Sequence, residues 1–140
     1  MKSVFGICAV AALAQAIPSC LVTNPQTTVR LVNNTSHTVE VQLFYDDTQE
    51  LPKDLIKLDG TEVNQTVLSG AVQTFSRDCD VLQAIYIENA KLMVLGDIGP
   101  NEDTDAFHEP DDFSCGDTLT FTFTQNTLGS DLAIDFTAAP

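Results

Sequence analysis

The segment between Asp97 and Asp117 carries the side chains that best suit metal chemistry. It holds eight acidic residues and neither Lys nor Arg. Hard cations such as Ca²⁺ are bound by several carboxylate, amide and carbonyl oxygens from one loop. The alternation of oxygen-bearing side chains predicts a candidate calcium site. Its five expected ligands are Asn101, Asp103, Asp105, Glu109 and Asp112.

The same segment departs from the helix-loop-helix calcium motif. Position six of the loop is Ala106 where that motif has Gly, position twelve is Asp112 where it has Glu, and Pro110 intervenes. The flanking residues are also typical of strands. The alternative is a solvated acidic loop, which is what most runs of charge are. Calcium is the only cofactor that the sequence suggests.

Histidine offers a second kind of chemistry. His37 lies in an Asn-rich turn and His108 lies beside Glu109 in the acidic loop. A histidine oriented by a carboxylate is one part of a hydrolase triad, but neither histidine accompanies a Gly-x-Ser-x-Gly nucleophile motif. We therefore expect no enzymatic activity, and a secreted hydrolase is the weaker alternative.

The four cysteines raise a question of pairing. Cys8 lies in an apolar run that follows Lys2, and small residues follow the run. This arrangement is typical of a secretory signal peptide, predicted over 1–19. Export permits disulfides, and it leaves three cysteines, Cys20, Cys79 and Cys115. Because three is odd, one of them must be free, intermolecular or modified.

Two cleavage sites compete at the end of the signal. Cleavage after Ala16 would leave a thiol at Cys20. The second pattern is Ile17-Pro18-Ser19-Cys20, which resembles the lipobox of bacterial lipoproteins and departs from it at Pro18. The resemblance implies that Cys20 is the lipidated N-terminal residue.

The cysteine count favours this second outcome. If Cys20 carries lipid, Cys79 and Cys115 are left to form a disulfide with each other. They stand 36 positions apart, and closing such a loop would stabilise the fold by about 4 kcal/mol in the chain-entropy model.

Apolar and polar residues alternate in most of the chain from Thr27 onward. Eight short segments show this period of two, which is typical of half-buried strands: 27–32, 38–45, 61–68, 71–77, 84–88, 92–96, 117–125 and 131–136. The first two flank a turn and predict a hairpin, and residues 89–91 predict another turn. Leu51, Leu55 and Leu58 have helical spacing and predict one short helix in the 51–58 region, lying over one edge or end of the sheet.

Strands of this length and spacing predict an all-β fold, an antiparallel β-sandwich of about seven to eight strands. The sandwich domain is expected over 27–137, after a tether over 20–26. The strand and turn pattern resembles that of small immunoglobulin-like and transthyretin-like sandwiches. This resemblance implies the architecture of the domain and nothing about its function. The positions that carry this resemblance are Val29, Arg30, Val32, Asn33, Tyr45, Asp46 and Gly70.

Charge limits the classes of partner. Without residues 1–19, 20 acidic residues remain against five basic ones, a net charge of −15. Nucleic acid is a poor partner for such a surface because its phosphates require Lys and Arg. We expect an acidic domain held by lipid on a membrane of the cell envelope, periplasmic or outer-membrane face, or secreted if Cys20 is not lipidated. Its role would be binding or structural, with a protein or glycan ligand still to be named; a calcium-dependent binding module is the alternative.

Overall fold

The computed structural model describes residues 23–96, 98–126 and 130–140. The predicted signal peptide over 1–19, the expected lipidation residue Cys20 and the first part of the tether lie outside the described residues. In the described part, no helix is both long and apolar enough to cross a membrane.

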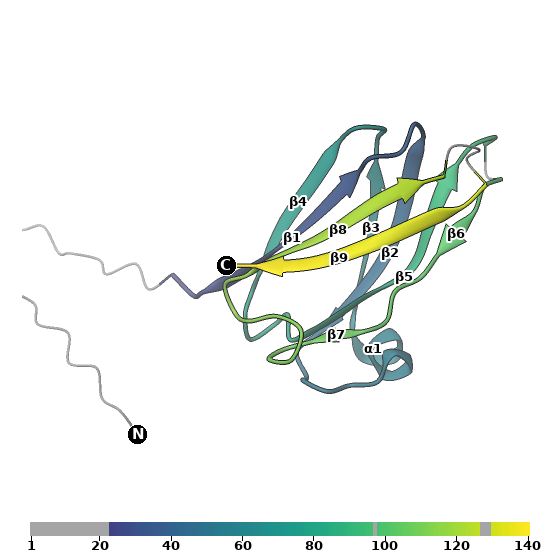
Figure 1. Ribbon diagram of the computed structural model, residues 1–140. Helices are drawn as coiled ribbons and strands as arrows, with labels where there is room; N and C mark the ends of the chain where they lie inside the picture. Colours follow the sequence, from purple (N-terminus) through teal and green to yellow (C-terminus); the bar gives the residue numbers. More distant parts are fainter. Residues whose placement is uncertain (1–22, 97, 127–129) are drawn as a thin grey trace, which may run out of the picture.

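The described residues form two sheets and one helix (Figure 1). Sheet A has the strand order β4-β1-β8-β9, and sheet B has the order β3-β2-β5-β6 with β7 also paired to β5. The elements are β1 (Gln26–Asn33), β2 (Thr38–Asp46), α1 (Lys53–Asp59), β3 (Thr61–Val67), β4 (Val72–Asp78), β5 (Ala84–Met93), β6 (Asn101–Glu102), β7 (Phe107–His108), β8 (Thr118–Gln125) and β9 (Leu132–Ala139).

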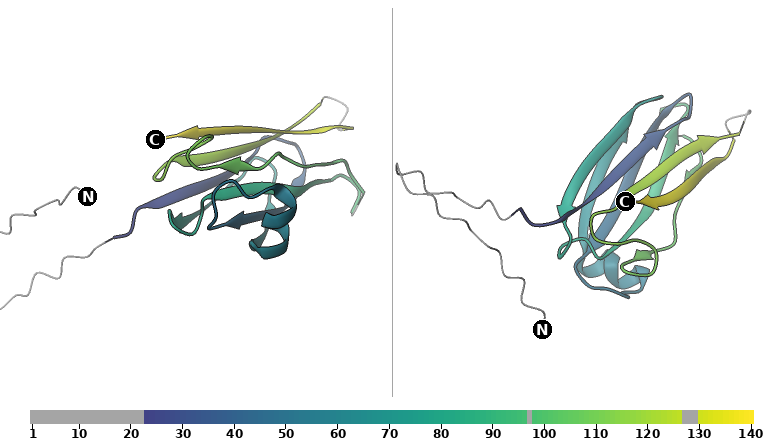
Figure 2. Two further views of the ribbon diagram at one scale, coloured as in Figure 1. Left: turned by 90° about the horizontal axis from the view of Figure 1, so that it is seen from below. Right: turned by 60° about the vertical axis from the view of Figure 1, so that its left-hand side comes forward.

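The core lies between the two sheets, which Figure 2 shows as stacked layers with α1 on the far side of sheet B. Alternate residues of each strand face inward, as in β1, where Val29 and Leu31 are fully buried. Phe121 and Phe123 of β8 join the same apolar cluster, as do Val39 and Leu43 of β2. The predicted all-β sandwich with one short helix is therefore confirmed.

The strand connections differ from the expected hairpin over 27–45. The chain leaves sheet A after β1 and enters sheet B at β2, so the turn between them joins two layers. Asn33 fixes this turn, because its buried side chain donates to the carbonyls of His37 and Val67. Moreover, β1 pairs with β8 in parallel, so sheet A is not purely antiparallel. A period of two identifies strands but does not specify which sheet each strand joins.

Strand β5 is one strand where the sequence predicted two strands and a turn over 89–91. It pairs with β2 along its whole length, with a register shift opposite Gln42 and Leu43. Asn89 pairs with Gln42 and Ile87 pairs with Leu43, so Glu88 is the extra residue of a β-bulge. One inserted residue reverses which side chains of a strand face inward. In the sequence this interrupts the alternation of apolar and polar residues, and the interruption predicted a turn.

Helix α1 begins after Pro52 and ends before Gly60, close to the predicted boundaries. A proline at a helix start and a glycine at its end are the expected signals. The buried face differs from the prediction. Ile56 is fully buried, whereas Leu55 and Leu58, which helical spacing placed on the buried stripe, are exposed. The helix packs on the outer face of sheet B and buries Ile56 against Phe44 and Tyr86.

Candidate functional site

The structure joins Cys79 and Cys115 by a disulfide, as the cysteine count indicated, with 5.3 Å between the two Cα atoms. Cys79 follows β4 and Cys115 precedes β8, and these are the two strands that flank β1. The bridge passes Thr27, whose buried Oγ1 lies 3.6 Å from the sulfur of Cys79. The disulfide therefore fastens both neighbours of β1 together at the start of the domain.

The five predicted calcium ligands are not brought together. In the described parts of the chain, no three His, Cys, Asp or Glu side chains lie where they could hold a metal ion. Asp103 instead pairs with Lys53, with 3.6 Å between Oδ2 and Nζ. Glu109 accepts a hydrogen bond from the backbone N–H of Cys115, and Asp112 accepts one from that of His108.

The course of the acidic segment explains this separation. The segment runs extended beside β5, where Asn101 pairs with Lys91 and His108 pairs with Ala84. Ala84 and Lys91 are seven positions apart in β5, which corresponds to about 23 Å along a strand. The acidic residues of this extended segment therefore lie too far apart to surround one ion. The geometry does not support a single calcium site over residues 101–112.

Both histidines make contacts that hold turns. His108 Nε2 lies 2.9 Å from the carbonyl oxygen of Leu51, at the chain that leads into α1. His37 Nδ1 lies 3.0 Å from the hydroxyl of its neighbour Ser36 and 3.5 Å from the amide oxygen of Gln125. The carboxylate of Asp112 lies 4.0 Å from His108 Nδ1, which is beyond hydrogen-bond distance. In the described residues neither imidazole is therefore hydrogen-bonded to a carboxylate as the base of a Ser-His-Asp triad is, and this geometry does not favour a hydrolase.

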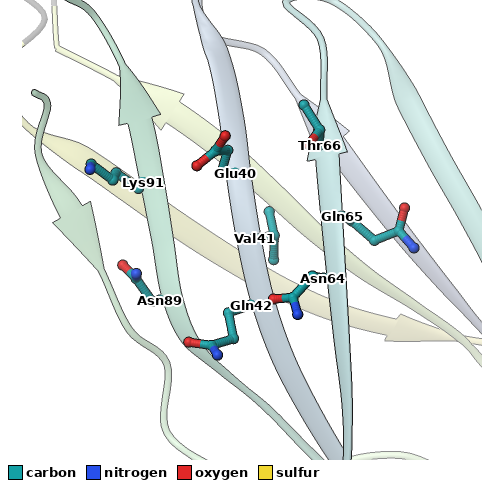
Figure 3. Close-up of a pocket in the computed structure, with 8 residues that line it drawn as sticks. All are labelled: Glu40, Val41, Gln42, Asn64, Gln65, Thr66, Asn89 and Lys91. Carbon is teal, nitrogen blue, oxygen red and sulfur yellow. The ribbon is translucent and has the colours of Figure 1, made fainter. Parts of the chain in front are cut away.

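The feature with the best claim to binding is a shallow groove on the outer face of sheet B, which the sequence did not single out (Figure 3). We call it the polar groove, with a volume of about 410 Å³, within the usual range for ligand sites. Its lining comes from β2, β3 and β5: Glu40, Val41, Gln42, Asn64, Gln65, Thr66, Asn89 and Lys91.

The outward-facing side chains of the polar groove form two rows across the three strands. In the first row, Thr66, Glu40 and Lys91 occupy paired positions on β3, β2 and β5. The second row contains only amides, Asn64, Gln42 and Asn89, in the same order of strands. The charges of Glu40 and Lys91 lie on neighbouring strands and offset each other. The residues that line the groove thus carry no net charge, and most of them offer hydrogen-bonding groups.

A carboxylate beside the groove fixes the orientation of two of its amides. Glu62 Oε1 accepts hydrogen bonds of 2.8 Å from Gln42 Nε2 and from Asn64 Nδ2. These bonds stabilise the ionised carboxylate, so the amide of Gln42, and to a lesser extent that of Asn64, lowers the pKa of Glu62 below its ordinary value. Since the amide nitrogens face Glu62, the amide oxygens are the atoms left to accept from a ligand.

The groove ends where α1 covers the sheet. The next outward-facing residues along β2 and β5 are Phe44 and Tyr86, which stack under the helix with ring centroids 5.5 Å apart. Burial raises the pKa of Tyr86. Lys57 of α1 forms an ion pair with Glu88, and this contact lowers the pKa of Glu88. The helix is thereby fastened to the bulge of β5, at the edge of the polar groove.

A weak signal of the polar groove exists in the sequence. Polar residues recur two apart in two predicted strands, as Glu40 and Gln42 and as Asn64 and Thr66, and again in the predicted turn, as Asn89 and Lys91. Such pairs are typical of any solvent-facing side of a sheet. Their meeting in two rows depends on the strand order β3-β2-β5 and on the bulge at Glu88, which turns Asn89 and Lys91 outward.

Comparisons with known proteins supply no functional family. No protein-family model matches the chain, and no curated protein matches it. Among solved structures it is similar to the NMR structure of a protein from Eubacterium rectale, with 14% sequence identity and a TM-score of 0.46. The similarity covers 86% of this chain and 94% of that chain. At this level it carries no argument about function.

Proposed function

We propose that this chain is an exported, lipid-anchored domain that binds a ligand at the cell envelope without catalysis. The observation that carries the proposal is the polar groove, an open face of sheet B with convergent hydrogen-bonding groups. The rest of the proposal depends on the sequence, where the predicted signal and the lipobox-like Ile17–Cys20 motif direct the chain to a membrane.

The position of the groove suits a domain anchored through its N-terminus. Strand β1 begins at Gln26, beside Asp78 at the end of β4, and runs away from there to Asn33. Its length corresponds to about 23 Å. Glu40 and Gln42 follow soon after the turn at the far end of β1, as Figure 1 shows for the start of β2. An anchor before Gln26 would therefore leave the polar groove toward the end of the domain that is distant from the membrane.

Membrane fractionation combined with intact mass of the protein from its native host tests the anchor. We expect the protein in the membrane fraction with a diacylglyceryl adduct on Cys20, and a Cys20→Ser variant in the soluble fraction. Ser19→Ala is the matched control, because it keeps a small residue in the lipobox-like motif and should stay with the membrane.

A free amine on Ile17 together with a soluble native protein would contradict the anchor. That result would place the cleavage after Ala16 and would leave a thiol at Cys20. The polar groove would then belong to a secreted domain.

A further inference from the structure

We propose that the polar groove binds an uncharged glycan, lying across strands β3, β2 and β5. This inference rests on the binding role proposed above and names the class of ligand. It depends on three properties of the groove: an excess of hydrogen-bond acceptors, a balance of charge, and two parallel rows of side chains.

The acceptors come chiefly from the amide row. Glu62 holds the amide nitrogens of Gln42 and Asn64, so their oxygens are left for a ligand. The third amide, Asn89, has a side-chain oxygen that is shielded from solvent and has no hydrogen-bond partner among the described residues. A shielded acceptor without a donor is unfavourable, because it has lost its hydrogen bonds to water and gained none in return. If the Asn89 side chain rotates toward the groove, its oxygen can accept a hydrogen bond from a hydroxyl group of a ligand.

The charges in and beside the groove count most strongly against an anionic ligand. Lys91 is the one cation among the residues that line the groove, and Glu40 lies directly opposite it on β2. An anionic ligand would meet Glu40, the neighbouring Glu62 and a chain of net charge −14. A cationic ligand would meet Lys91. Hydroxyl groups both donate and accept, so they match Lys91 and the carboxylate of Glu40 without a net charge.

The arrangement in rows suits a linear chain of similar units. Neighbouring strands lie about 4.8 Å apart, so each row presents three polar groups at a regular spacing across the sheet. None of the residues that line the groove in the described structure is aromatic, and Val41 is their only aliphatic member. The groove therefore offers no pocket for the apolar side chains of a peptide, and hydrogen bonds must supply most of the affinity. We expect weak binding, near a millimolar dissociation constant.

Side-chain amide NMR provides a direct test, because the NH₂ groups of Gln42, Asn64 and Asn89 report on the groove itself. The mature chain is purified from membranes in a zwitterionic detergent, which avoids sugar headgroups, and is titrated with linear hexasaccharides of glucose, mannose and N-acetylglucosamine. The expected result is saturable shifts of these three amides with at least one hexasaccharide. The amide of Gln73, on β4 of the other sheet, should not move.

Substitutions locate the site. Gln42→Ala and Asn64→Ala should each weaken binding at least fivefold, since each removes an acceptor. Gln73→Ala is the matched control, an exposed amide on a strand of sheet A, and should leave the affinity unchanged. Glu62→Gln tests a positioning role: the NH₂ signals of Gln42 and Asn64 should move in the free protein, and binding should weaken as well.

Two results would overturn the inference. One is the absence of groove shifts with all three hexasaccharides at millimolar concentration. The other is saturable binding of a Lys-rich decapeptide to the groove amides with a higher affinity than any hexasaccharide. Neither result bears on the fractionation of the Cys20→Ser variant, so a failure of the glycan assignment is distinguishable from a failure of the membrane anchor.

Discussion

The outer face of sheet B has two halves that the same strands β2 and β5 build in opposite ways. In the covered half, Phe44 and Tyr86 lie beneath α1 with Ile56. In the open half, Gln42 and Asn89 occupy the next outward-facing positions and reach solvent in the polar groove. The face changes from apolar to polar within one residue pair, at the bulge of β5. Helix α1 covers one half, and the other half is open to solvent.

The difference shows how a sequence marks a doubly covered strand. Strands covered on both faces have continuous apolar runs, whereas half-covered strands alternate. Leu43-Phe44-Tyr45 and Ala84-Ile85-Tyr86-Ile87 are such runs, and all seven residues are buried. Val39–Gln42 alternates instead, because no element covers its outer side. The predictions below test whether these two halves differ in what they contribute to stability and to binding.

The largest expected effect is the loss of the apolar contact under α1. Ile56→Ala should lower the free energy of unfolding by about 2–5 kcal/mol, because it leaves a cavity against Phe44 and Tyr86. Urea unfolding followed by circular dichroism measures this. Leu58→Ala on the same helix is the control, since Leu58 is 76% exposed, and should change stability by less than about 0.5 kcal/mol. Equal losses for the two variants would mean that Ile56 does not anchor the helix.

A smaller effect is expected at the end of the helix, where the chain enters β3. A Cβ atom on Gly60 would lie 2.4 Å from the carbonyl oxygen of Ile56 and 2.7 Å from that of Tyr45. Both neighbours are backbone, so Gly60→Ala must shift α1 or β2 and should lower the free energy of unfolding by about 1–3 kcal/mol. Urea unfolding checks it. A neutral outcome would show that α1 is less tightly seated on the sheet than these contacts indicate.

The sequence predicted the sandwich because its strands alternate and their turns are frequent. It predicted α1 from the helical spacing of leucines, and Pro52 and Gly60 mark the two ends of the helix in the structure. It did not reveal that Ile56 is the buried residue, since Leu51, Leu55 and Leu58 have an equally good helical spacing. The sheet that a helix will cover determines which face is buried, and that is a tertiary property.

The candidate site was less predictable for a similar reason. The sequence indicated a calcium site because the expected ligands are close together in the chain. Pairing with β5, however, extends this segment and separates Asn101 from Asp112. The polar groove collects residues from three strands that are far apart in the chain. One further obstacle is local: the extra residue Glu88 exchanges the faces of β5, so an unbroken alternation from Ile85 and Ile87 would have pointed Asn89 and Lys91 into the core.

In the open half, substitutions should cost almost no stability. Gln42→Ala and Lys91→Ala should each change the free energy of unfolding by less than about 0.5 kcal/mol, because these side chains pack against no apolar core. Urea unfolding of the two variants beside Ile56→Ala gives the contrast. If a groove variant is destabilised as strongly as the helix variant, the side chains of the polar groove serve the stability of the sheet, and the proposed binding role loses its support.

The smallest effects concern two carboxylates, one in each half, whose pKa values are lowered for different reasons. Glu88 is held by the hydrogen bond that Lys57 donates and by the positive charge of that donor, whereas Glu62 is held by the neutral amides of Gln42 and Asn64. Both pKa values lie below the ordinary value of 4.5. Each group therefore stabilises the fold at neutral pH, and that contribution is lost as the pH falls through its folded-state pKa.

Carboxyl-carbon NMR titrations at two salt concentrations separate these causes. Between 0.1 M and 1 M salt the screening length falls from about 10 Å to about 3 Å, so the pKa of Glu88 should rise toward 4.5 while that of Glu62 stays low. Gln42→Ala should raise the pKa of Glu62, and Asn64→Ala should raise it less, because Gln42 is the larger cause. A Glu62 that follows the salt as Glu88 does would mean that charge, and not the two amides, holds it. The amide oxygens of the polar groove would then lose the orientation on which glycan binding depends.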